Sequence, residues 1–91
     1  MRYFQYPSIL TDITDKHLQP HDIFKKYCED DCKWLEDNDI TYQVDVFHWP
    51  QLPFFTDRQI AKVRSEFTIV IENVTQACMF RLYSGLSEGI Q

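Results

Sequence analysis

Three cysteines and three histidines are the residues of this chain that could bind a metal ion or act as nucleophiles. They are Cys28, Cys32, Cys78, His17, His21 and His48. Cys28 and Cys32 are about one helical turn apart, and together with two histidines they would supply the ligands of a tetrahedral zinc site. Structural zinc sites usually take paired ligands from a turn, so a zinc-stabilised domain stays an alternative hypothesis, and we assign no metal ligand and no cofactor. The simpler interpretation places Cys28 in the core with Cys32 beside it, because free cysteine is often buried.

Enzymatic chemistry is not expected from this sequence. A cysteine and a histidine could meet in the fold, but no motif indicates an activated thiol or an oxyanion hole. Both glycines, Gly85 and Gly89, belong to the last seven residues. A phosphate-binding loop needs glycine so that backbone amides can approach the anion, which excludes the usual nucleotide-binding loops from residues 1–84. We therefore predict a protein without catalytic residues.

The element expected to position Cys28 and Cys32 is a long amphipathic helix over residues 20–37. At 100° per residue its apolar side chains gather on one side. They are Ile23, Phe24, Tyr27, Cys28, Trp34 and Leu35. The opposite side holds Lys25, Lys26, Glu29, Asp30, Lys33, Glu36 and Asp37. Pairing of these charges at four-residue spacing is typical of a solvated face, so most of the acidic run 27–39 is explained as helix surface.

Asp31 does not fit this helix, because it projects into the middle of the apolar stripe between Tyr27 and Leu35. A buried carboxylate needs a hydrogen-bond or charge partner. We expect a bond to a tyrosine or tryptophan, or a pair with an arginine. The candidate arginines are Arg2, Arg64 and Arg81. Two alternatives stay open: a helix rotated so that Asp31 lies at its rim, or a charge kept for a binding partner.

The remaining elements are read from shorter patterns. Alternation of apolar and polar residues predicts strands over 1–6, 41–49 and 66–72, with Phe67, Ile69 and Ile71 facing inward. Residues 7–20 have the turn residues of a loop, and a capping box at Thr56 and Gln59 predicts a short helix over 56–65. Residues 73–85 are ambiguous, and we favour a turn followed by a strand over a helix. The sum is a single α+β domain, residues 1–91, with a mostly antiparallel sheet of three or four strands, one long amphipathic helix and one short helix.

Charge and composition limit the partners of this domain. The net charge is −5 and the isoelectric point about 4.9, so direct binding to nucleic acid or to an anionic membrane is not expected. The N-terminal residues lack the apolar run of a signal peptide, and no stretch is long enough to span a membrane. An odd number of cysteines cannot all be paired within one chain. We expect a cytoplasmic protein.

The loop 47–55, with the sequence FHWPQLPFF, is the best candidate for a binding surface. Trp49, Phe54 and Phe55 are aromatic anchors of the kind enriched at protein interfaces, and the two prolines restrict the loop. We predict a non-enzymatic protein-binding module, an inhibitor or adaptor, in which these aromatics supply the buried contact. Acidic side chains would steer a protein partner with a basic surface. They are Glu29, Asp30, Glu36 and Asp37. A structural role as a homodimer or larger homo-oligomer through the aromatic loop is a further alternative.

The segment EFTIVIENVTQACMFRLYSG resembles the closing segments of small bacteriophage accessory proteins of unknown role. In those proteins a strand is followed by an acidic turn and then by an alanine, a phenylalanine and a leucine. The matching residues are Glu72, Ala77, Phe80, Arg81 and Leu82. Gln76 departs from the pattern, since an acid is common there. The resemblance covers about a fifth of the chain and implies a viral protein that binds and blocks a host or defence protein, but it transfers no functional residue.

Overall fold

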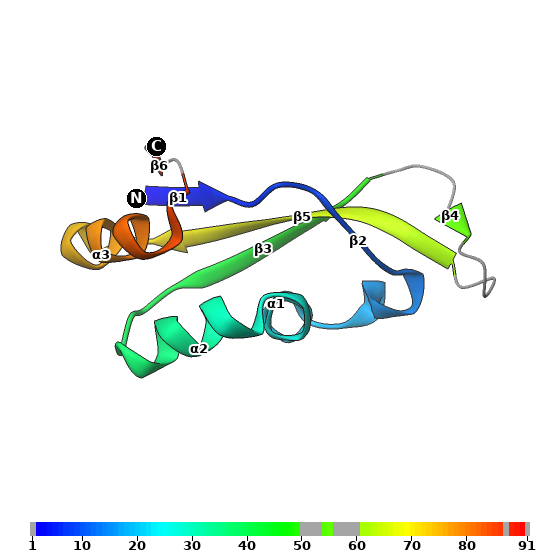
Figure 1. Ribbon diagram of the computed structural model, residues 1–91, viewed down its shortest axis with the longest axis horizontal. Helices are drawn as coiled ribbons and strands as arrows, with labels where there is room; N and C mark the ends of the chain where they lie inside the picture. Colours follow the sequence, from blue (N-terminus) through cyan, green and yellow to red (C-terminus); the bar gives the residue numbers. More distant parts are fainter. Residues whose placement is uncertain (1, 50–53, 56–60, 87, 91) are drawn as a thin grey trace.

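The computed structural model describes residues 2–49, 54–55, 61–86 and 88–90 (Figure 1). The strands are β1 (Arg2–Gln5), β2 (Ile9–Asp12), β3 (Gln43–His48), β4 (Phe54–Phe55), β5 (Ala61–Ile71) and β6 (Glu88–Ile90). The helices are α1 (Pro20–Tyr27), α2 (Glu29–Asp37) and α3 (Val74–Ser84), with the 3-10 helix η1 (Ile13–His17) before α1.

Strand β5 is the centre of the sheet. It pairs with β1 and β2 along one edge and with β3 and β4 along the other, and every pairing is antiparallel. At its broad end the sheet is four strands wide, in the order β3-β5-β1-β6. Apart from β2 and β4, the order is strand, helices, two strands, helix and strand, which is the connectivity of the ferredoxin-like split β-α-β arrangement. The predicted α+β class with an antiparallel sheet is confirmed.

Alternating burial explains why residues 61–71 form one long strand. Val63, Ser65, Phe67, Ile69 and Ile71 are all buried, and the residues between them are more exposed. Phe67, Ile69 and Ile71 face inward as predicted. The predicted helix over 56–65 is wrong for residues 61–65, and residues 56–60 lie outside the described chain. Pairing along both edges of β5 satisfies its backbone, and this tertiary pairing overrides the local helical spacing.

The predicted long helix is divided into two at Cys28. Cys28 has φ −130° and ψ 50°, outside the helical region, so that α1 ends and α2 begins there. Figure 1 shows the two helices with clearly different axes. Glu29, Asp30 and Asp31 occupy the first turn of α2, where carboxylates interact favourably with the positive helix end. These three acids are typical of the start of a helix, although residues 20–37 have the apolar spacing of one continuous helix.

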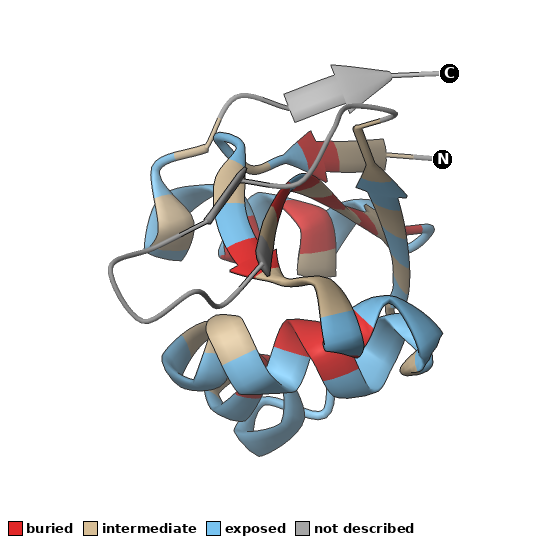
Figure 2. Ribbon diagram, turned by 90° about the vertical axis from the view of Figure 1, so that its right-hand side faces the viewer, coloured by how far each residue is buried: buried red, intermediate tan, exposed pale blue. Residues whose placement is uncertain are grey.

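Aromatic side chains join the helices to a single face of the sheet. The Phe24 ring of α1 lies 5.8 Å from Phe67 of β5, and the Phe80 ring of α3 lies 5.0 Å from Phe4 of β1. All four side chains are fully buried. The buried residues lie between the sheet and the helices (Figure 2), so the core has one helical layer and one sheet layer.

Helix α3 replaces the strand favoured for residues 74–84. The side chain of Asn73 accepts a hydrogen bond from the backbone N–H of Gln76 at 3.0 Å and caps the first turn. Gly85 ends the helix with φ 71°, a left-handed conformation that glycine adopts without strain. Ala77 and Phe80 are three residues apart and fill the core, which is the helical period. The strand interpretation of this segment was therefore wrong, and the helical alternative is confirmed.

Residues 7–20, expected to be a loop, contain β2 and η1. Gln5 pairs with Thr68 and Ile9 pairs with Ser65, so the three residues 6–8 face only two residues of β5. A bulge of this kind lets a strand continue after a proline, which cannot donate a ladder hydrogen bond.

None of the helices in the described part of the chain is long and apolar enough to cross a membrane.

Candidate functional site

The face of the sheet that points away from the helices carries an aromatic cluster at one end. We define the aromatic cluster as Leu10, Phe47, Trp49 and Arg64. Phe47 is 55% exposed and Leu10 is 50% exposed. The guanidinium of Arg64 lies 5.6 Å from the Trp49 ring, and the Phe47 and Trp49 rings meet edge to face at 6.5 Å. Leu10 pairs directly with Arg64 across β2 and β5, so three neighbouring segments contribute to one surface.

Trp49 is the member of this cluster that the sequence predicted. Its backbone N–H donates to the carbonyl of Arg64 at 2.8 Å, which extends the β3–β5 ladder by one residue. The indole Nε1 is buried and has no hydrogen-bond acceptor among the described residues. Ring contacts with Phe47 and Arg64 therefore hold the half-buried indole in place. Phe54 and Phe55 form β4, paired with Lys62 and Ala61, but their side chains lie outside the described part of the structure.

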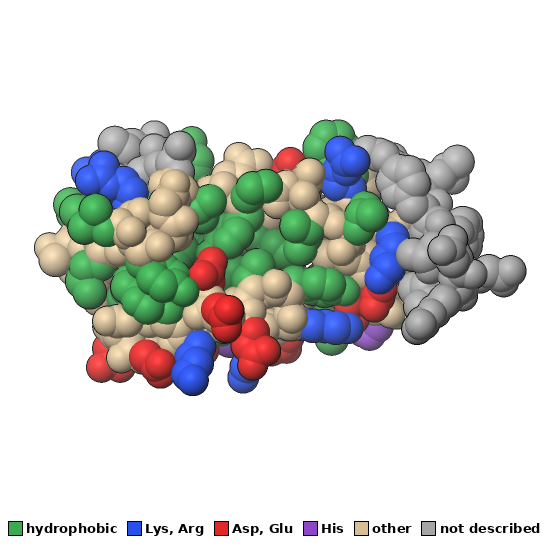
Figure 3. Space-filling model, viewed as in Figure 1, with side chains coloured by type: hydrophobic (Ala, Val, Ile, Leu, Met, Phe, Trp, Pro, Cys, Tyr) green, Lys and Arg blue, Asp and Glu red, His purple; other side chains and the backbone are tan. Residues whose placement is uncertain are grey.

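The acidic residues proposed for steering are on a different part of the molecule. Glu29, Asp30, Glu36 and Asp37 are all exposed on α2, which packs against the other face of the sheet. Acidic and basic side chains alternate along the helical edge of the molecule in Figure 3. Figure 1 places the end of α2 and strand β4 at opposite ends of the long axis. The structure therefore does not bring the aromatic and acidic halves of the predicted surface together.

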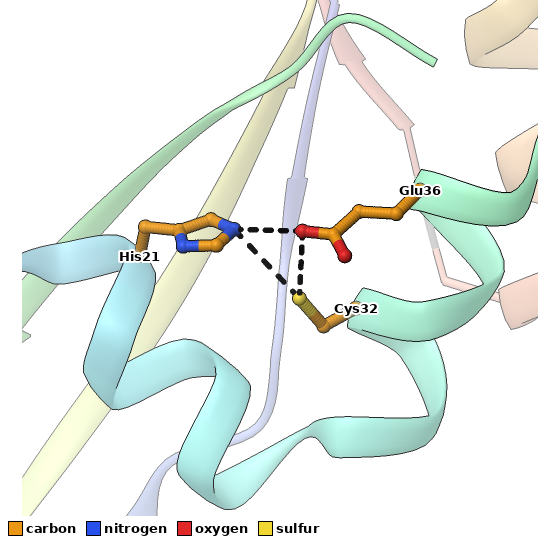
Figure 4. Close-up of side chains that lie close together, drawn as sticks. All are labelled: His21, Cys32 and Glu36. Carbon is orange, nitrogen blue, oxygen red and sulfur yellow. Dashed lines mark hydrogen bonds and ion pairs between the residues drawn. The ribbon is translucent and has the colours of Figure 1, made fainter. Parts of the chain in front are cut away.

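A second group of reactive side chains lies between α1 and α2. We call His21, Cys32 and Glu36 the His–Cys–Glu cluster (Figure 4). His21 Nε2 lies 3.2 Å from Glu36 Oε1, and Cys32 Sγ lies 3.8 Å from each of these atoms. The hydroxyl of Tyr42 completes the group, 2.9 Å from His21 Nε2 and 3.4 Å from Cys32 Sγ. Cys32 is buried, whereas His21 and Glu36 are about half exposed.

This cluster corrects the assignment of the two helical cysteines. Cys32 is 1% exposed and belongs to the core, whereas Cys28 is only half-buried, the reverse of the predicted order. The break at Cys28 changes the direction of the chain, so the two cysteines do not follow one continuous helical projection. His48 is bound elsewhere, with its Nδ1 2.7 Å from the Ser65 hydroxyl within the sheet. Among the described residues, the group of potential metal ligands that meets is His21, Cys32 and Glu36, so neither Cys28 nor a second histidine joins Cys32 in a ligand set.

Neither of the helical cysteines has the properties of an activated nucleophile. Burial raises the pKa of the Cys28 thiol to about 11, and the charge of Asp31 adds to this effect. Burial also raises the pKa of the Cys32 thiol, although the Tyr42 hydroxyl opposes the shift. A thiol with a raised pKa is protonated at neutral pH and attacks poorly. The raised pKa values therefore disfavour a thiolate nucleophile at either cysteine.

Asp31 has the tyrosine partner that we expected for it. The Tyr6 hydroxyl donates to Asp31 Oδ2 at 2.5 Å, and both side chains are half-buried. Burial and then this hydrogen bond raise the pKa of Tyr6. The short bond joins α2 to the segment between β1 and β2. Asp31 therefore has a structural role, which the interpretation based on hydrogen bonding anticipated.

Replacing Asp31 by leucine should destabilise the protein by at least about 1 kcal/mol, because the half-buried Tyr6 hydroxyl loses its charged acceptor. The free energy of unfolding in urea measures this effect. Asp30→Leu is the matched control, since Asp30 is the exposed neighbour on the same helix, and we expect a change within about 0.5 kcal/mol. Equal unfolding curves for Asp31→Leu and the native chain would contradict the structural role of Asp31.

Comparison with known proteins adds no relative: no protein-family model matches the chain, and neither the curated proteins nor the solved structures include a significant match. The class that the fold and its surfaces define is a small α+β domain with one helical layer and an aromatic cluster on the other side of its sheet.

Proposed function

We propose that this protein is a non-enzymatic protein-binding module, an inhibitor or adaptor, that contacts its partner through the aromatic cluster. The observation that carries this proposal is the exposure of Phe47 and Leu10 beside the cation–π pair of Trp49 and Arg64. Tryptophan and arginine are the residue types most enriched among residues that dominate binding energy. Exposed apolar side chains gathered at one place are typical of interaction surfaces.

The arrangement of the cluster favours binding because its backbone is already ordered. Leu10, Phe47 and Arg64 belong to paired strands, and Trp49 is tied to Arg64 by a backbone hydrogen bond. A partner would therefore bind without ordering a flexible loop, which lowers the entropic cost of association. Burial of the exposed part of Phe47 and Leu10 would supply apolar contact area at the centre of the interface.

The charge of the molecule favours a partner with a basic surface. The net charge is −5, and Asp45 and Glu66 lie on the same face of the sheet as the aromatic cluster. Screening at physiological salt limits charge interactions to about 8 Å, so the acids of α2 contribute little to docking at this face. We therefore assign the contact to the aromatic cluster and only a minor steering effect to Glu36 and Asp37. The resemblance to bacteriophage accessory proteins agrees with a cytoplasmic protein that blocks a host protein, which forms part of this proposal.

Variants of the aromatic cluster test the proposal. Partners are first captured from a lysate of the cells in which the protein is made, and affinities are then measured with the purified partner. We expect Phe47→Ala and Trp49→Ala each to weaken binding about tenfold or more, because both remove central aromatic contacts. Leu82→Ala is the matched control, since Leu82 is also exposed but lies on α3. Unchanged affinity of both aromatic variants, or binding of a nucleic acid in place of a protein, would overturn the proposal.

A charge-reversal variant separates contact from steering. Glu29→Lys combined with Asp37→Lys, two exposed acids of α2 outside the His–Cys–Glu cluster, should lower the association rate and its salt dependence slightly but leave the dissociation rate unchanged. If this charge-reversal variant lost as much affinity as Trp49→Ala, α2 would have to be part of the central contact surface.

A homo-oligomer is a second candidate function, favoured by a different surface from the one that the sequence indicated. Helix α3 exposes Val74, Met79 and Leu82, which is unusual for a helix at the surface of a monomer. Molar mass measured by light scattering over a range of concentrations distinguishes the candidates. Assembly through α3 would be supported if the molar mass of the native chain doubles with concentration while that of Leu82→Asp stays at the monomer value.

A further inference from the structure

The atoms of the His–Cys–Glu cluster have the spacing of ligands around one metal ion. Zinc binds nitrogen and oxygen at about 2.0–2.1 Å and sulfur at about 2.3 Å, so tetrahedral angles place nitrogen and oxygen about 3.3 Å apart and sulfur about 3.6 Å from either. The corresponding distances in the cluster are 3.2 Å for His21 Nε2 to Glu36 Oε1 and 3.8 Å for each distance to Cys32 Sγ. Figure 4 shows the three side chains pointing toward one another. The three atoms form one face of a slightly distorted tetrahedron, in which only the two distances to sulfur are longer than ideal.

Hydrogen bonding explains this convergence only in part. His21 Nε2 is close to three groups, the Glu36 carboxylate, the Cys32 thiol and the Tyr42 hydroxyl. One ring nitrogen of a neutral imidazole is either a donor or an acceptor, so it cannot satisfy all three groups. A cation at the centre of the cluster would interact favourably with the nitrogen lone pair, a thiolate and a carboxylate at once.

We infer that His21, Cys32 and Glu36 bind a zinc ion through the imidazole Nε2, the thiolate and a carboxylate oxygen. Zinc accepts a mixed set of nitrogen, sulfur and oxygen ligands, whereas magnesium and calcium prefer oxygen alone. Cys32 and Glu36 are four residues apart on α2, so one helical face presents both ligands. The Tyr42 hydroxyl lies 2.9 Å from His21 Nε2 and 3.4 Å from Cys32 Sγ, so it would border the bound ion.

The surroundings of His21 fit a ligand. The Asp22 carboxylate lies 4.0 Å from Nδ1, the ring nitrogen that would not bind the metal. Metal-binding histidines commonly donate the second ring N–H to a carboxylate, and the Asp22 carboxylate lies beside that nitrogen but beyond hydrogen-bond distance. The bound ion would link α1 to α2 across the break at Cys28 and so hold the two helices at their observed angle. This inference uses residues on the helical layer and does not depend on the protein-binding proposal.

Metal titration of the purified full chain, kept reduced, tests the inference. We expect one zinc ion per chain, and a cobalt derivative with the strong absorption bands of a tetrahedral ion and a thiolate-to-cobalt charge-transfer band. Cys32→Ser should abolish the charge-transfer band. His21→Ala and Glu36→Gln should each weaken zinc binding about tenfold or more, since the loss of even an outer partner of a metal ligand costs about 10–100-fold.

Cys28→Ser is the matched control, because Cys28 is a helical neighbour of the same type that lies outside the cluster. It should keep the stoichiometry, the charge-transfer band and the rise in melting temperature that zinc produces. Absence of stoichiometric zinc, or a loss in Cys28→Ser equal to that in Cys32→Ser, would overturn the assignment. If Cys32→Ser does not fold, Glu36→Gln is the deciding variant, because Glu36 is exposed and its replacement leaves the core unchanged. A zinc affinity of Glu36→Gln equal to that of the native chain would also overturn the assignment.

Discussion

Replacing Phe24 by alanine should lower the free energy of unfolding by about 3–5 kcal/mol, the usual cost of deleting a buried phenyl ring. Phe24 is fully buried, and its ring lies 5.7 Å from Tyr6, 5.8 Å from Phe67 and 6.5 Å from Tyr42. These contacts join α1 to the sheet, so the cavity left by the substitution would lie between the two layers. Domains of this size are stable by only about 5–15 kcal/mol, which makes the loss large enough to leave part of the protein unfolded.

Phe47→Ala is the control for this experiment, because the same residue type is mostly exposed at position 47. We expect that variant to lose less than about 1 kcal/mol. Urea unfolding followed by circular dichroism measures both variants. Similar losses of unfolding free energy in Phe24→Ala and Phe47→Ala would contradict the assignment of Phe24 to the core and of Phe47 to the exposed face of the sheet.

Removing the charge of Asp15 should produce the second-largest effect on stability. The Asp15 carboxylate is buried, accepts a hydrogen bond from the Tyr27 hydroxyl at 2.6 Å, and pairs with Lys26 Nζ at 2.9 Å. Hydrogen bonds to charged groups contribute about 1.5–3 kcal/mol, so Asp15→Asn should destabilise the protein by about 1–3 kcal/mol near neutral pH. The affected contacts join η1 to the end of α1.

The pH dependence of this effect has a defined sign. The hydrogen bond from Tyr27 and then that from Lys26 lower the pKa of Asp15 below its ordinary value of 3.8. A carboxyl with a lowered folded-state pKa contributes stability above its unfolded pKa, and that stability is lost as the pH falls through the folded-state pKa. The difference in the free energy of unfolding between the native chain and Asp15→Asn should therefore be largest at neutral pH and should decrease as the pH is lowered. Asp22→Asn serves as the control, since Asp22 is exposed, and a difference that does not change with pH would contradict a charged Asp15.

The parts of the fold that the sequence predicted correctly are those with unbroken periodicity. Phe24 and Leu35 face the core as the helical projection required, and Phe67 and Ile69 face it as the alternating strand required. The prediction failed where tertiary structure competed with a local pattern. Residues 61–65 match a helix locally, but they pair with strands along both edges of β5. In the sequence, the end of α1 at Cys28 was indicated only by the three acidic residues that follow Cys28.

The candidate sites were predicted in part. Trp49 was identified from its residue type, and Phe47 and Arg64 could have been found as the outward-facing residues of their strands. Their meeting depends on the register between β3 and β5, which single segments do not specify. For the His–Cys–Glu cluster, the four-residue spacing of Cys32 and Glu36 was a readable signal. His21 joins them because α1 and α2 are separate helices, and that follows only from the structure.

Site-specific photo-cross-linking tests most directly whether the aromatic cluster is the contact surface. Phe47 is replaced by p-benzoylphenylalanine, which keeps an aromatic ring at an exposed position, and a second chain carries the same amino acid in place of the exposed Val74 on α3. After irradiation in the cells that make the protein, we expect position 47 to give one dominant cross-linked protein that position 74 does not give. A partner cross-linked from position 74 and absent from position 47 would contradict the assignment of the binding surface to the open face of the sheet.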